Sequence, residues 1–233
     1  SVAQRWDRVA DGMNAWVRGA TGVLGTLLML AAAVRGAGSV TGEMEKDTWI
    51  SLTSSPLSAW EIVFGKWCGT VAGLRRGYWA LLAVWATALA FGGFRAYMLP
   101  VVALATAFYI AIFAWLGIWC SVTARTSLIA TVRAVLLGVT VIGGFWVVAA
   151  FCCILPLEMM DRTVFRSIEP FLSGLLGATP PIVVGWLPWS HDENHEYGPF
   201  GWRETMFGPY LPILGAMVWL AFGFLLAFRS HSG

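Results

Sequence analysis

The run PVVALATAFYIAIFAWLGIWCSV, from Pro100 to Val122, contains no charged side chain. A helix that crosses the hydrocarbon core of a bilayer needs about 20 mostly apolar residues in succession, so this run predicts a membrane-spanning helix. The composition agrees, because 58% of the 233 residues are hydrophobic and 12% are charged, whereas soluble domains carry about 25% charged residues. With a mean hydropathy of +0.71, the chain is predicted to be an integral membrane protein.

Four further runs reach a similar length, if end residues are allowed to extend to the headgroups. The predicted spans, about five in number, cover residues 19–38, 77–94, 100–122, 130–155 and 211–228. Glycines recur within them and favour close helix packing; they are Gly22, Gly25, Gly36, Gly38, Gly138, Gly143 and Gly144. The sequence thus predicts an all-α, polytopic transmembrane helical bundle that occupies residues 1–233 as a single domain.

The chain begins at Ser1, and its first eighteen residues contain three Arg and two Asp. A secretory signal peptide would instead combine a basic start, a short apolar core and a cleavage site. We therefore expect an N-terminally truncated fragment, because a parent with an even number of spans would place at least one more span upstream of these five.

Membrane topology is predicted from Lys and Arg, which are retained in short cytoplasmic loops. Residues 41–76, residues 123–133 and the tail after residue 228 all carry Lys or Arg, and they alternate so that they share the cytoplasmic face. Residues 156–210, with seven acidic residues and three Arg, are then external, as is the Arg-bearing start of the chain. Within the external segment, Gly and Pro in residues 171–189 favour a re-entrant hairpin over the alternative, which is a sixth span.

Ionisable groups are missing from the central spans, since residues 62–157 contain no Asp, Glu or His. A proton- or ion-coupled carrier needs such a group within the membrane, and intramembrane hydrolysis needs a general base or a metal ligand. Both classes are therefore disfavoured, and no catalytic residue is predicted. A net charge of +2 without a run of Lys or Arg also argues against a nucleic-acid partner.

Two possible ligand sites are weakly supported by the sequence. His191 and His195 lie four residues apart among acidic residues, but the Pro and Gly that flank them favour a solvated loop over a metal site. A phosphate loop needs Gly-rich sequence before a Lys that is followed by Ser or Thr, whereas Lys66 is followed by Trp67. We expect no metal and no nucleotide in this chain, and buried thiols at the four cysteines.

Residues 41–69, TGEMEKDTWISLTSSPLSAWEIVFGKWCG, interrupt the apolar pattern. Thr41 is predicted to cap a short helix over residues 42–53. Glu43 and Glu45 would then lie in its first turn, where the helix dipole favours carboxylates. Apolar residues at steps of three and four make this predicted helix amphipathic, which suits a position at the cytoplasmic membrane surface.

A second helix is predicted directly after Pro56, which cannot continue the first. Ser58 and Glu61 have the spacing of a capping box, and Leu57 and Ile62 occupy the two positions of a hydrophobic staple. Such a start fixes the angle at which the chain returns to the membrane. The interruption is therefore predicted to be a pair of short, ordered helices.

This segment resembles the signature loop of the ABC-2 type permeases, the membrane subunits of a large group of ATP-binding-cassette exporters. In that family an acidic E-x-E stretch and a Thr are followed by a Leu-rich turn with T-P-L-S, then by E-I and G-K; this chain has Ser55 where Thr is more common. The matching positions are Glu43, Glu45, Thr48, Leu52, Pro56, Leu57, Ser58, Glu61, Ile62, Gly65 and Lys66. A second stretch, GIWCSVTARTSLIATVRA, is similar to a later cytoplasmic turn of these permeases, where Ser121, Arg125, Thr126 and Arg133 would lie.

The resemblance implies a permease subunit of an ABC transporter, which couples ATP hydrolysis by a separate ATPase subunit to substrate export across the plasma (inner) membrane. It implies that residues 41–69 contact that ATPase, that ATP and Mg bind to the partner, and that this chain is neither an enzyme nor the holder of a cofactor. The other implied partners are a second permease subunit, either different or identical, and the lipid bilayer. Two alternatives stay open: a non-transporting membrane scaffold or assembly protein, and, less favoured, a secondary transporter.

Overall fold

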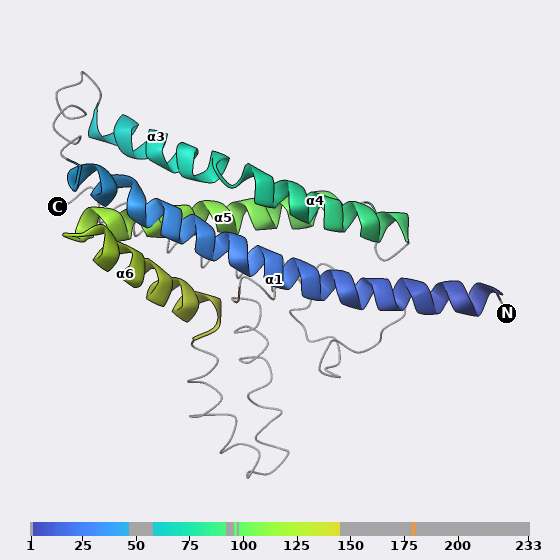
Figure 1. Ribbon diagram of the computed structural model, residues 1–233. Helices are drawn as coiled ribbons and strands as arrows, with labels where there is room; N and C mark the ends of the chain where they lie inside the picture. Colours follow the sequence, from blue (N-terminus) through green and yellow to red (C-terminus); the bar gives the residue numbers. More distant parts are fainter. Residues whose placement is uncertain (1, 47–57, 92–95, 97, 145–178, 180–233) are drawn as a thin grey trace, which may run out of the picture.

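The structure, a computed structural model, describes residues 2–46, 58–91, 96, 98–144 and 179, and every element within these ranges is helical (Figure 1). The elements are α1 (Val2–Met44), α3 (Ala59–Ala72), α4 (Arg75–Ala90), α5 (Met98–Thr123), α6 (Ser127–Val139) and a π-helical turn, η1 (Thr140–Gly144). The predicted all-α class is confirmed. The predicted span at 211–228 and most of the predicted external segment, with His191 and His195, lie outside the described residues.

Helix α1 is one continuous helix of 43 residues, which corresponds to a length of about 65 Å. It contains the predicted span at residues 19–38 and extends beyond it at both ends. The predicted external start of the chain is the first part of this helix, and Figure 1 shows it reaching past the other helices at the N-terminal end. The thirty-three residues of Gly12–Met44 are long and apolar enough to cross a membrane.

Helices α3 and α4 follow one another in line, separated only by Gly73 and Leu74 (Figure 1). The sequence predicted a short helix here, the second of a cytoplasmic pair, and in the structure α3 packs along α5. The indole Nε1 of Trp67 donates a hydrogen bond to the carbonyl oxygen of Ala111 at 2.9 Å, and Trp60 packs against Trp115 with ring centroids 5.7 Å apart. Trp60 and Trp67 thus attach α3 to α5.

Helix α5 contains the second stretch that is long and apolar enough to cross a membrane, Val102–Thr123. It agrees with the predicted span at residues 100–122. Helix α4, with 16 residues, and the apolar stretch Ser127–Gly143 are shorter than a full span within the described residues. Two of the five predicted spans therefore meet the length criterion, and the remainder of the predicted spans at 77–94 and 130–155 reaches beyond the described ranges.

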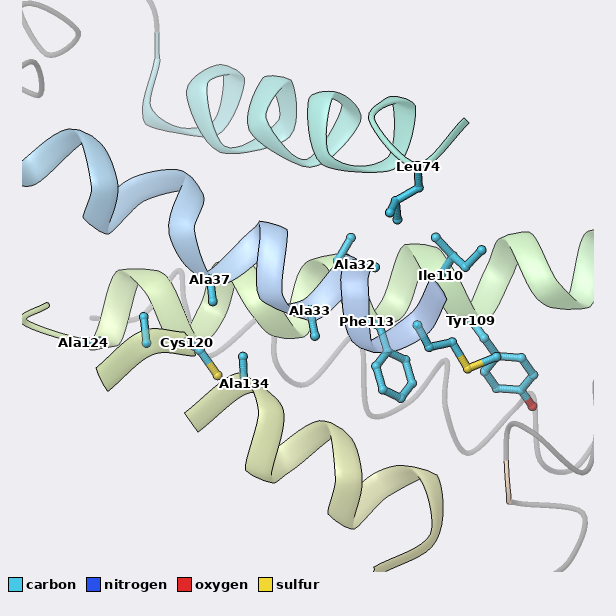
Figure 2. Close-up of a cluster of buried hydrophobic side chains, with 13 residues drawn as sticks. Ala32, Ala33, Ala37, Leu74, Tyr109, Ile110, Phe113, Cys120, Ala124 and Ala134 are labelled. Atoms are coloured by element: carbon cyan, nitrogen blue, oxygen red, sulfur yellow. The ribbon is translucent and has the colours of Figure 1, made fainter. Parts of the chain in front are cut away.

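The core lies where α1 packs against α5, and small residues let the two backbones approach each other closely. A Cβ at Gly36 would lie 2.6 Å from the carbonyl oxygen of Ala114, and a Cβ at Gly117 would overlap the carbonyl of Ala33. Figure 2 shows Ala33 and its neighbours on α1 in the same buried cluster as Phe113 of α5 and Ala134 of α6. Three helices thus share one apolar core.

A second core at the other end of the bundle fixes α4 against α1 and α5. It is made of Val17, Leu81, Trp85, Ala88 and Val102. In this core, the indole Nε1 of Trp85 donates a hydrogen bond to the hydroxyl of Thr21 at 3.1 Å. Nearby, the hydroxyl of Tyr78 donates to the carbonyl oxygen of Ala103 at 2.6 Å. Side-chain donors on α4, one buried and one partly buried, are therefore paired with acceptors on α1 and α5.

Candidate functional site

Four helix ends meet at one end of the bundle, the left side of Figure 1. Helices α1 and α5 end there, and α3 and α6 begin there. These ends carry most of the residues of the two segments that the sequence singled out, residues 41–69 and 121–133. The contacts described next join the two segments directly, although they are far apart in the chain.

A salt bridge links α3 to the end of α1. The Nζ atom of Lys66 lies 2.6 Å from Oε1 of Glu43, and the Lys66 side chain is 14% exposed while that of Glu43 is 33% exposed. The same Nζ atom donates to the carbonyl oxygen of Ser39 at 2.9 Å. Because this ammonium group is largely withdrawn from water, removal of the Glu43 carboxylate would leave a partly buried charge without its counter-ion. The pair thus fixes the position of α3 relative to α1.

A second carboxylate, two residues later, links α1 to α6. The Oε1 atom of Glu45 accepts the backbone N–H of Ser127 at 2.7 Å, and Oε2 accepts its hydroxyl, also at 2.7 Å. Thr126 is the N-cap of α6, and its hydroxyl accepts the N–H of Ile129 at 3.3 Å. Glu45 thus lies at the N-terminus of α6, where the helix dipole favours a carboxylate.

Ionisation of this carboxylate is favoured by its contacts. The backbone N–H of Ser127, and after it the Ser127 hydroxyl, lower the pKa of Glu45 from its ordinary value. Both groups donate to the charged form, so the hydrogen bonds are charge-assisted and are stronger than bonds between neutral groups. At neutral pH, Glu45 therefore holds α6 as an anion.

Thr41 is placed differently from the prediction. It lies inside α1, so the prediction that it caps a new helix was wrong, and Glu43 and Glu45 lie at the end of α1 rather than in a first turn. The Thr41 hydroxyl donates to the carbonyl oxygen of Ala37, four residues earlier, at 3.0 Å. Threonine can make such back-bonds inside a helix as well as cap one. The sequence pattern alone could not distinguish the two roles.

The hydroxyl of Ser121, on α5, contacts the backbone of α1 next to Thr41. It accepts the backbone N–H groups of Val40 at 3.1 Å and of Thr41 at 3.0 Å. Ser121 and Thr41 are both buried, with their hydroxyl oxygens 3.3 Å apart. Since the Thr41 hydroxyl donates to Ala37, it accepts the proton of Ser121. Ser121 was predicted in a cytoplasmic turn, but here it joins α5 to the last turns of α1.

The predicted capping box at the start of α3 is confirmed. The hydroxyl of Ser58 accepts the N–H of Glu61 at 3.3 Å, and Oε2 of Glu61 accepts the N–H of Ser58 at 2.7 Å. The hydroxyl and then the N–H of Ser58 lower the pKa of Glu61. Later in α3, Gly65 is exposed, with open space around its Cα. Thr48, Pro56 and Leu57, and with Leu57 the predicted staple, lie outside the described residues.

The later segment also contains two arginines in different surroundings. Nη1 of Arg133, on α6, donates to the carbonyl oxygen of Thr123 at 3.3 Å, so a cation lies at the C-terminus of α5, where the dipole favours it. Arg125 is exposed in the turn between α5 and α6. Ser39 and Ser127 also belong to this site, and neither was predicted from the sequence. Ser127 directly follows Thr126, so the pattern of a helix start was the signal that could have identified it.

The chemistry of the site is that of fixed polar links between helices. Among the described residues, no group of three His, Cys, Asp or Glu could hold a metal ion. Each carboxylate at the end of α1 is bound to a cation or to hydroxyl and N–H donors of another helix. These contacts connect the end of α1 to both α3 and α6.

The comparisons with known proteins agree with this architecture. The family model described as "ABC-2 family transporter protein" matches residues 9–175, which include every helix from α3 to α6 and nearly all of α1. No curated protein and no solved structure matches the chain. The family match covers more than half of the chain and agrees with its apolar helices. The chain therefore belongs to the ABC-2 transporter family and is a membrane component of an ABC transporter.

Proposed function

We propose that the chain is the permease subunit of an ABC exporter in the plasma (inner) membrane. A separate ATPase subunit would bind ATP and Mg, and a second permease subunit, identical or different, would complete the pathway. The observation that supports this proposal most strongly is that Glu43 and Glu45 bind two different helices, α3 through Lys66 and α6 through Ser127. The end of α1 is thus connected to both.

The coupling step follows from where the connecting segment is attached. Residues 47–57 join the end of α1 to the capping box of α3, and they lie within residues 41–69, the segment that resembles the ATPase-contacting loop. A force applied there by a partner acts on α1 and α3 together. Through Ser127 and Ser121 it also reaches α6 and α5. Closure of the ATPase on ATP would then move four helices as a connected set, which is the kind of rigid-element coupling that switching proteins use.

Charge reversal at the salt bridge tests this proposal. Full-length chain carrying Glu43→Lys, Lys66→Glu or both changes is expressed with its ATPase subunit, and copurification and ATP hydrolysis in proteoliposomes are measured. We expect each single reversal to reduce ATP hydrolysis by the assembled complex, because like charges then meet at a partly buried site. The double reversal restores an attractive pair, so it should recover most of the hydrolysis.

The control is Cys68→Ser, on the same helix as Lys66; the sequence predicted a buried thiol here, but Cys68 is exposed, so that prediction was wrong. This variant should behave as the wild type. If both single reversals copurify with the ATPase and hydrolyse ATP as the wild type does, coupling through this end of the bundle is refuted. If the chain binds the ATPase but its presence never changes ATP hydrolysis, the chain is a scaffold rather than a permease.

A further inference from the structure

Three arginines lie together where α3 passes into α4. Arg75 and Arg76 are the first two residues of α4. Nη1 of Arg35, on α1, donates to the carbonyl oxygen of Gly73 at 3.3 Å. Gly73 is two residues before Arg75 in the chain, so this bond brings a third guanidinium to the start of α4. All three arginines are exposed. The sequence predicted Arg75 and Arg76 within the cytoplasmic segment of residues 41–76.

The position of this cluster along the bundle is fixed by two hydrogen bonds to α5. On one side of the α3–α4 break, Trp67 donates to Ala111; on the other side, Tyr78 donates to Ala103. The α3–α4 break therefore lies beside α5 between Ala103 and Ala111. Both residues belong to the stretch of α5 that is long and apolar enough to cross a membrane. The arginines are well away from the end of the bundle that holds Glu43 and Glu45.

The described helices offer these arginines no carboxylate nearby. Within the described ranges there is no Asp or Glu in α1 from Gly12 to Gly42, in α3 after Glu61, or in α4, α5 and α6. Arg75 and Arg76 lie in the first turn of α4, and its N-cap Leu74 makes no side-chain hydrogen bond. Cations in such apolar surroundings are costly unless an anion accompanies them.

We propose that Arg35, Arg75 and Arg76 form a binding site for a phosphate-bearing anion. The anion is either the headgroup of an anionic phospholipid or a phosphate-carrying solute. Guanidinium groups suit this ligand because they present paired N–H donors that match the geometry of phosphate oxygens. Basic pockets between membrane helices bind anionic lipid headgroups in the same way.

Gly73 shapes the site by letting Arg35 approach. A Cβ at this position would lie 2.7 Å from Nη2 of Arg35 and 3.0 Å from its Cζ. The absence of a side chain therefore allows the Arg35 guanidinium to rest on the end of α3, beside the arginines of α4. Arg35 is held by this contact, whereas Arg75 and Arg76 project from an exposed helix start.

The test measures lipid binding to purified, detergent-solubilised full-length chain. Phosphatidylglycerol and phosphatidylcholine are titrated separately, and the rise in melting temperature reports binding. We expect phosphatidylglycerol to bind in preference to phosphatidylcholine, and the double variant Arg75→Gln, Arg76→Gln to bind it about thirty-fold more weakly, because each arginine near a headgroup contributes about 1 kcal/mol. Arg125→Gln is the matched control, since Arg125 is also exposed but lies in the α5–α6 turn, and this variant should bind as the wild type does.

Competition identifies the source of the anion. If pyrophosphate displaces phosphatidylglycerol and stabilises the wild type but not the double variant, the site takes a phosphate-carrying solute; if pyrophosphate has no effect, the site takes the lipid. Equal binding of the two lipids by the wild type, together with no response to pyrophosphate, would overturn the proposal, as would an equal loss of binding in Arg125→Gln. Arg35→Gln is a secondary variant, because loss of its bond to Gly73 could disturb the fold, and the double variant decides the outcome.

Discussion

Replacing Gly117 by Ala should separate the two central helices. In an open helix interior this change is favourable by about 0.5–1 kcal/mol, because Ala loses less backbone freedom on folding than Gly. At Gly117 the added methyl group would overlap the carbonyl oxygen of Ala33 and lie 2.9 Å from its carbonyl carbon and 3.0 Å from its Cα. All three atoms belong to the backbone of α1, so no side-chain rotation relieves the contact.

The expected magnitude follows from these two opposing effects. Overpacking of a closely packed core costs about 1–3 kcal/mol, and the helix propensity of Ala offsets part of that cost. The net destabilisation should be about 1–2 kcal/mol. The displacement also acts one turn further along α5, where the hydroxyl of Ser121 accepts the N–H groups of Val40 and Thr41.

Thermal unfolding of the full-length chain in detergent measures the effect. A loss of about 1–2 kcal/mol lowers the melting temperature by about 2–8 °C for a chain of this size. The matched control is Gly38→Ala, which lies on α1 near the same interface but has nothing within 4 Å of its added Cβ. This control should melt at or slightly above the wild-type temperature.

The result that would refute this reasoning is a Gly117→Ala variant that melts at or above the wild-type temperature while the control is unchanged. In that case the backbones of α1 and α5 would not lie in close contact at Gly117. A fall of the same size in both variants would also contradict the argument. It would mean that glycine serves both positions for a reason other than helix contact.

Three further outcomes are expected at the polar end of the bundle. Ser58→Ala removes the N-cap of α3 and should cost about 1 kcal/mol, measured by thermal unfolding, with Ser58→Asp recovering most of it; no recovery would contradict the capping role. Ser121→Ala leaves two buried N–H groups, one of them on Thr41, without this acceptor and should cost about 1–3 kcal/mol in the same assay, more than Ser121→Thr. Because the folded-state pKa of Glu45 is depressed, its bond to Ser127 stabilises the fold above the ordinary pKa of 4.5, and this stabilisation is lost as the pH falls below that value. The protection factor of the Ser127 amide, which is its exchange rate relative to the unstructured rate at the same pH, should therefore fall there in the wild type, and an unchanged protection factor would count against the bond.

Local features of this fold could be predicted from the sequence. The capping box of Ser58 and Glu61 depends on residues three apart in one helix, and the structure contains it. The long apolar run that ends at Val122 predicted a spanning helix, and α5 agrees closely with it. Both predictions succeeded because the side chains and the backbone that decide them are neighbours in the chain.

The contacts between distant segments could not be predicted in the same way. Glu45 and Ser127 are 82 residues apart, and their bond depends on the packing of α1 against α5 and α6. The glycine pattern indicated close packing and included Gly36, but Gly117 was not singled out, because its role depends on which helix lies opposite. For the same reason the partner of Lys66 could be identified only in the folded chain.

The spacing of the two carboxylates at the end of α1 has a consequence for how the chain tolerates change. Successive residues of a helix are rotated by about 100°, so Glu43 and Glu45 point in directions about 200° apart, toward opposite neighbours. The N–H of Glu45 still bonds to the carbonyl of Thr41, so the helical turn continues this far. Deleting or inserting one residue ahead of Glu43 would turn both carboxylates away from their partners at once. The E-x-E motif therefore supplies two charges and also requires one particular rotation of the end of α1 about its axis.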